Sequence, residues 1–219
     1  IQLGGGEINL YGVINSTATS DTAEGFTYSS VTPYERVGAA YSPDFDSYEI
    51  SLGASGDITI TGTIDLAGSL LIAAGADVEI YDTTLEVAGS GNQVHVISDA
   101  DLALGRAAIA NGHDSYPDGQ RYQQGGLIAA ETKIHLQAQG LIALGSGTQV
   151  MVSAENSQIL IAAANLDVVG SVYAGARLAS DQESIDWTSA NSSIDIDVTE
   201  LATLGGLGVD NATGEQATR

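Results

Sequence analysis

Eight acidic residues alternate with Ile, Leu and Val in short runs of the sequence, and their carboxylates are hard oxygen ligands. Alternate side chains of a strand point to opposite faces, so these acids face outwards if the aliphatic residues face inwards. Carboxylates stacked about 5 Å apart repel unless a cation or a hydrogen-bond donor lies between them. Ca²⁺ favours such oxygens. The eight acids are Asp57, Asp65, Asp77, Glu79, Glu86, Asp101, Asp195 and Asp197.

Within this set the candidate calcium ligands are Asp77, Glu79, Glu86, Asp195 and Asp197. The alternative interpretation is a solvated acidic face that holds no metal and keeps the protein soluble. The repeat-in-toxin motif that builds shared calcium sites in tandem is matched only once, at Gly205–Asp210. Calcium is therefore the one cofactor to consider.

Histidine offers little further chemistry. His113 lies close to Asp114 and Asp118, but the spacing matches no known metal motif and indicates a polar surface loop. His95 and His135 fall at outward strand positions, where we expect them to face solvent.

Catalysis on polysaccharides is the main enzymatic possibility. A glycosidase needs two carboxylates in a groove, and with 28 acids a pair such as Asp195 and Asp197 is not specific. Sugar grooves usually add aromatic platforms, and Trp187 is the single Trp. A formal charge of −22 would repel an anionic polymer. We therefore expect no enzyme and no catalytic residue.

Tyrosines mark a possible binding patch. Tyr28, Tyr34, Tyr41 and Tyr48 crowd one irregular segment, which also contains Phe26 and Phe45. Such rings supply rigid contact area for a partner at low entropic cost. Packing of the same rings onto the flank of the fold is the alternative.

Composition limits the partners and the core. Six Lys and Arg against 28 acids argue against nucleic acid and against an anionic membrane. The sequence has no Cys and no apolar run long enough to cross a bilayer. With two Phe and one Trp, the core must consist of Ile, Leu, Val and Ala. A first residue other than Met suggests a piece of a longer protein.

Short strands must position these residues. Turn residues such as Gly, Ser and Asn separate the units, and the spacing is regular: Ile134, Ile142, Val150 and Ile159 are eight, eight and nine residues apart. Hairpins of a β-sandwich and parallel coils of a β-solenoid both fit, but the hairpin pairs Asn-Gly and Asp-Gly occur only at 111–112 and 118–119, so we favour the solenoid. The units are Glu7–Tyr11, Asp57–Thr61, Thr63–Leu66, Asp77–Tyr81, Thr84–Val87, Gln93–Val96, Asp101–Leu104, Lys133–Leu136, Leu141–Leu144, Gln149–Val152, Gln158–Ile161 and Ser193–Val198.

Two segments interrupt the pattern. We expect a solenoid over residues 1–204 with loop insertions at about 15–47 and 107–130, and a flexible tail or linker over 205–219. About eight coils of about 20 residues would remain. Leu71, Met151 and Leu160 fall at outward positions, which indicates either lateral association or a second covered face. No polar cap is evident at either end, so we expect stacking on further solenoid.

The segment Gly4–Ser16, GGGEINLYGVINS, resembles the repeat unit of filamentous-haemagglutinin-like giant bacterial adhesins. Gly140–Gly145, Gln158–Ala163 and Leu166–Gly175 resemble coils of the same proteins. The resemblance implies an all-β, right-handed parallel β-helix that is exported to the bacterial cell surface for adhesion or matrix.

We therefore expect a structural segment of an extracellular fibre, sheath or adhesin that presents a long acidic surface. Its partners would be further copies or repeats of the parent protein, and surface glycans or proteins of a host or neighbouring cell. The alternative is a carbohydrate-active β-helix enzyme or a carbohydrate-binding module.

Overall fold

The chain forms an all-β structure, described here from a computed structural model, and the described residues contain no helix. These residues are 2–17, 20–29, 50–88, 91–105, 127–130, 133–178, 185–187, 191–205 and 207–209. The strands are β1 (Gln2–Gly5), β2 (Glu7–Thr17), β3 (Ser20–Ser29), β4 (Ile50–Ala54), β5 (Ile58–Leu66), β6 (Leu70–Ala74), β7 (Val78–Val87), β8 (Gln93–Ser98), β9 (Leu102–Leu104), β10 (Leu127–Ala130), β11 (Lys133–Ala138), β12 (Leu141–Leu144), β13 (Gln149–Val152), β14 (Gln158–Val168), β15 (Ser171–Ala174), β16 (Ala176–Leu178), β17 (Ile185–Trp187), β18 (Ser193–Leu204) and β19 (Leu207–Val209).

Parallel pairing dominates and forms three ladders. The first ladder runs through β1, β4, β6, β8, β11 and the first halves of β14 and β18. The second joins the first halves of β2, β5 and β7 to β9, β12 and the second halves of β14 and β18. The third joins the second halves of β2, β5 and β7 to β10, β13, β15 and β19.

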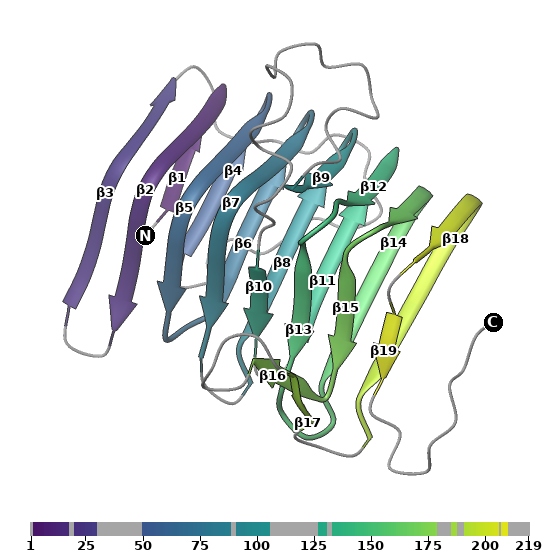
Figure 1. Ribbon diagram of the computed structural model, residues 1–219. Coiled ribbons are helices and arrows are strands. Elements are labelled where there is room, and N and C mark those ends of the chain that lie inside the picture. The colour runs from purple at the N-terminus through teal and green to yellow at the C-terminus, as the bar shows by residue number, and fades with distance from the viewer. Residues whose placement is uncertain are drawn as a thin grey trace.

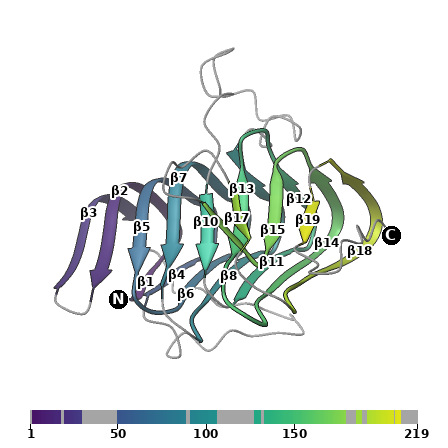
Figure 2. The ribbon, with the colours of Figure 1, turned by 60° about the horizontal axis from the view of Figure 1, so that its bottom comes forward.

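Each passage of the chain through the three ladders is called a layer here. Layer 3, for example, is β6 with β7, and layer 7 is β18 with β19. The layers lie side by side from β3 at one end to β18 at the other (Figure 1). The large parallel sheet that results curves nearly into a barrel (Figure 2).

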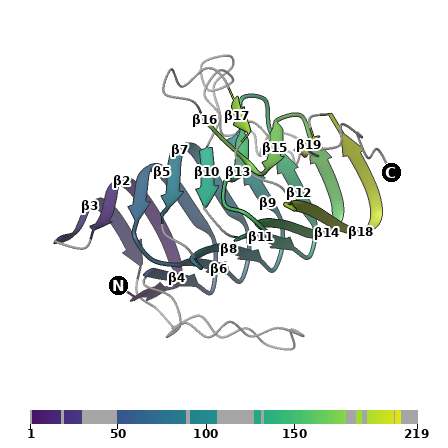
Figure 3. The same ribbon diagram turned by 90° about the horizontal axis from the view of Figure 1, so that it is seen from below.

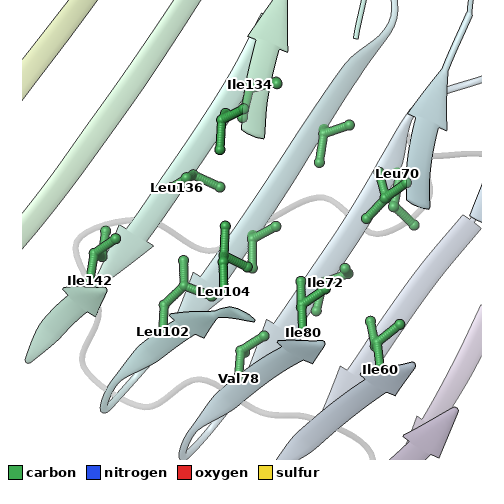
Figure 4. Packing of buried hydrophobic residues seen from close by; sticks show 14 of the residues in the cluster. Ile60, Leu70, Ile72, Val78, Ile80, Leu102, Leu104, Ile134, Leu136 and Ile142 are labelled. Atoms are coloured by element: carbon green, nitrogen blue, oxygen red, sulfur yellow. The ribbon is translucent and has the colours of Figure 1, made fainter. Parts of the chain in front are cut away.

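Aliphatic side chains fill the inside of this curved sheet. Equivalent positions of successive layers stack in register, as Leu52, Ile72, Val96 and Leu136 do on the first ladder, and all four are fully buried. Figure 4 shows such residues of the first and second ladders meeting in one cluster on the inner face of the sheet. Within the described residues the cluster contains Ile, Leu, Val and Ala and no aromatic ring. The prediction of an aliphatic core is confirmed.

The outer face of the first ladder is also buried in its middle layers. Leu71, Ala73 and Ile97 form a second cluster there and are fully buried. Leu71 is therefore covered rather than exposed, and Leu160 on the same ladder is half-buried. Met151, on the third ladder, is also buried. Burial on both faces explains why β6, Leu70–Ala74, shows no alternation in the sequence.

The expected loops contain additional strands. β3 falls within the first expected insertion and pairs antiparallel with β2, so it extends the sheet by one strand at its first layer. β10 ends the second expected insertion, and β19 lies within the expected tail. Backbone groups that would otherwise lack partners explain these extra strands, because an open sheet edge favours pairing.

A tight corner between the second and third ladders constrains the residues found there. Gly62 has a φ of 137°, and a Cβ at this position would collide with the carbonyl oxygen of Gly12 in the layer before. Layer 3 has one extra residue instead, with Asp82 at a φ of 46°. The buried Thr83 then donates its hydroxyl to the carbonyl of Tyr81, 2.6 Å away.

Candidate functional site

The acidic corner, defined as Asp57, Asp77 and Asp101, lies where the first ladder passes into the second. These residues precede the equivalent positions Ile58, Val78 and Leu102, so they stack in consecutive layers. Asp57 Oδ1 accepts a hydrogen bond from the backbone N–H of Asp77 at 3.1 Å, and Asp77 Oδ1 accepts from the N–H of Asp101 at 3.0 Å.

The series continues for one more layer. Asp101 Oδ1 accepts from the N–H of Leu141 at 2.7 Å. Gly140 has no side chain here, and a Cβ would collide with this carboxylate. Backbone donors therefore lie between the stacked carboxylates, which is one of the two arrangements that relieve their repulsion.

The candidate calcium ligands lie in separate places. Glu79 is half-buried on β7 beside Thr59 and Ala103 of the adjacent layers, and Glu86 is exposed beside Asp65. No group of three or more His, Cys, Asp or Glu side chains suited to a metal ion occurs among the described residues. Calcium binding therefore stays a prediction.

Asp195 and Asp197 lie together on the outer face of β18, where both are exposed. Their neighbours in the preceding layer are Leu160 and Ala162. Gln158 Nε2 donates to Asp195 Oδ2 at 2.6 Å, so an amide of the preceding layer stabilises this carboxylate. The pair is far along the sheet from Asp77, at the edge of the last layer (Figure 1).

The tyrosine patch is described only in part. Tyr28 lies on β3, where its register partner is the core residue Ile8. Tyr34, Tyr41 and Tyr48 fall outside the described residues, as do His113, Asp114 and Asp118. Both interpretations of the tyrosine patch therefore stay open.

Two histidines stack on the outer face of the first ladder. His95 and His135 are register partners, and their rings are 4.3 Å apart with 16° between the planes. The prediction that both face solvent is wrong for His95, which is 3% exposed. Desolvation, with a smaller effect of the nearby Lys133 charge, lowers the pKa of His135 from 6.5 to about 4.

Sequence spacing gave no signal for this pair. The two histidines are 40 residues apart, twice the interval between Ile50 and Leu70, because 22 residues of sequence separate β9 from β10. Matching the flanking patterns Gln-Val-His-Val and Lys-Ile-His-Leu could have found them.

An aromatic pair lies on the flank of the third ladder. Trp187 of β17 is 47% exposed and meets Tyr173 of β15 edge to face, with ring centroids 6.0 Å apart. Met151, the register partner of Tyr173, is buried next to it. Figure 3 shows β16 and β17 beside β13 and β15.

The described residues include no helix of the length and apolarity that crossing a bilayer requires. Comparison with protein-family models, with curated proteins and with solved structures gave no match in any of the three.

Proposed function

We propose that this chain is a structural segment of a right-handed parallel β-helix, part of an extracellular fibre, sheath or adhesin on a bacterial cell surface. The observation that carries the proposal is the first ladder, in which seven strands stack in register over an aliphatic core. Such a stack presents repeated surface and buries apolar area between neighbouring layers.

The outside of the stack supports an exposed, hydrated role. The formal charge of −22 keeps the surface solvated and the protein apart from other anionic surfaces. In this proposal the segment stacks end to end with further solenoid, and glycans or proteins of another cell are the ligands of the finished fibre. Calcium would act as an added bridge between outer carboxylates.

Immunogold electron microscopy on intact cells that produce the protein tests the proposal. Gold particles along fibres outside the cell would support it, while label found only after the cells are opened would refute it. Small-angle scattering of the purified chain should give a maximum dimension set by about eight stacked strands at about 4.8 Å, plus turns.

The Trp187–Tyr173 pair favours a second candidate, a carbohydrate-binding module. An exposed indole supported by a second ring can stack on the apolar face of a sugar. A glycan array with the wild type and Trp187→Ala tests this candidate. Binding that the substitution abolishes would favour it, and turnover of a polysaccharide panel would point to an enzyme instead.

A further inference from the structure

The last layer leaves its core partly open. The C-terminal edge, defined as β18 (Ser193–Leu204), pairs with β14 alone among the described strands. Ile159 and Ile161 of β14 are at most 1% exposed, whereas their partners Ile194 and Ile196 are only partly buried. On the second ladder, exposure of the inward residue rises from 1% at Val168 to 40% at Leu204.

The first layer differs on its second and third ladders. β2 has β3 on its outer side, and its inward residues Ile8, Leu10 and Ile14 are fully buried. A second copy of the chain therefore cannot add its β18 to the outer edge of β2 while β3 is in place. On the first ladder β1 pairs with β4 alone among the described strands, but its residues Gln2–Gly5 would bring no cation to the acidic residues of β18. The two ends are at opposite sides of the molecule (Figure 1).

Charge argues against pairing of two C-terminal edges. Asp195, Asp197 and Glu200 are all exposed on β18. Pairing with the same strand of a second copy would add its three carboxylates to the same junction between two chains of charge −22. Like charges opposite one another destabilise a strand pair.

The preceding layer shows which side chains suit these carboxylates. Gln158 Nε2 donates to Asp195 Oδ2 at 2.6 Å, and Asn165 Nδ2 donates to Glu200 Oε2 at 3.0 Å. The neighbour of β18 on one side thus supplies amide donors. A strand on the other side meets the same acidic residues together with the open apolar positions.

We propose that the C-terminal edge binds, in parallel register, an extended segment of another polypeptide in which aliphatic residues alternate with Lys or Arg. The inference rests on the proposed structural function and identifies the partner at the stacking joint. Its aliphatic residues cover Ile194 and Ile196, its cations lie opposite Asp195 and Asp197, and its backbone continues the first ladder.

Peptide binding tests the inference directly. We would compare fluorescein-labelled Lys-Ile-Lys-Leu-Lys-Ala with Glu-Ile-Glu-Leu-Glu-Ala by fluorescence polarisation at low salt. The lysine peptide should bind about tenfold more tightly, and the difference should shrink in high salt because exposed ion pairs are screened. N-methylation along one backbone edge of the lysine peptide should weaken binding if that edge pairs with β18.

Charge reversal locates the site. The double substitution Asp195→Lys and Asp197→Lys should reverse the peptide preference, since both side chains are exposed on the edge. The matched control, Asp65→Lys with Glu86→Lys, changes the net charge equally in layers 2 and 3 and should retain the preference for lysine. Equal binding of both peptides, or the same effect of both double variants, would overturn the inference.

Failure of this inference differs from failure of the proposed function. Filaments of the purified chain alone would show that copies join one another, which contradicts the inference and supports a structural role. Selective binding of the lysine peptide by a protein that immunogold places only inside cells would support the inference and refute the extracellular function.

Discussion

Asp101→Ala should lower the stability of the stack by a measurable amount. Asp101 Oδ1 accepts from the N–H of Leu141 at 2.7 Å, and this bond joins two consecutive layers. Hydrogen bonds to charged groups contribute about 1.5–3 kcal/mol, and partial exposure of this site places it near the lower value, about 1.5–2 kcal/mol. A chain of this length changes its Tm by about 2–4 °C per kcal/mol, so the expected decrease is about 3–8 °C.

The matched control is Asp99→Ala. It removes the same charge two residues away, where Asp99 Oδ1 accepts a side-chain bond from Gln139 Nε2 at 3.2 Å at the exposed surface. Exposed bonds of this kind contribute little, so the Tm should change by about 1 °C or less. Asp101→Asn retains an oxygen acceptor and should lose under about 1 kcal/mol.

Thermal unfolding followed by circular dichroism measures all three variants, each with and without millimolar Ca²⁺. Equal decreases in Tm for the two alanine variants would refute the hydrogen-bond argument. If Asp101→Asn is as harmful as alanine, and Ca²⁺ raises the Tm of the wild type alone, the carboxylate charge holds a cation and the calcium interpretation is correct.

Three further substitutions test other parts of the structure. His135→Gln should remove a loss of stability that the wild type shows on acidification. The pKa of His135 is about 4 in the folded state and 6.5 in the unfolded state, so the wild type loses on the order of 1–2 kcal/mol of folding stability as the pH falls from 6.5 to 4. A Tm difference between variant and wild type that does not change with pH would contradict this. Gly62→Ala should lower the free energy of unfolding by at least about 2 kcal/mol, because φ is 137° and the new Cβ meets a backbone carbonyl. Urea unfolding measures this, and a midpoint equal to that of the wild type would show that the backbone at this corner adjusts without cost. Thr83→Val should cost about 1–2 kcal/mol through loss of its buried hydroxyl bonds, whereas Thr83→Ser should retain most of the stability.

Alternation in the sequence predicted the strands that have one buried and one exposed face. β5 was found at nearly its observed position, as Asp57–Thr61 and Thr63–Leu66, whereas only the first four residues of β14 were, as Gln158–Ile161. β6 was missed because every residue in it is buried, so Leu70–Ala74 shows no period of two. β4 was missed although Ile50–Ala54 does alternate. The local sequence pattern does not reveal that the outer face of a strand is buried, because burial depends on contacts made in the folded structure.

The candidate site was predicted in composition but not in arrangement. The sequence indicated that stacked carboxylates need a cation or a hydrogen-bond donor between them, and Asp57, Asp77 and Asp101 meet backbone N–H donors. The register between layers decides which donor meets each carboxylate. The register could not be derived from the sequence, because the interval between equivalent positions varies from 20 to 40 residues. Trp187 was noted as a single residue, but its contact with Tyr173 needed the β16–β17 pair.

The antiparallel pair of β2 and β3 has a consequence for the order of folding. Its strands are joined by two residues, whereas each parallel pair of the first ladder joins positions at least 20 residues apart. Closing the longer loops costs more chain entropy, and hairpins form within about 1–10 μs. Among the described strands of the large sheet, the β2–β3 hairpin is therefore the pair able to form early without a template, and each later layer would then deposit on the layer before it. A chain that leaves a narrow channel from its N-terminus could fold in this order as it emerges.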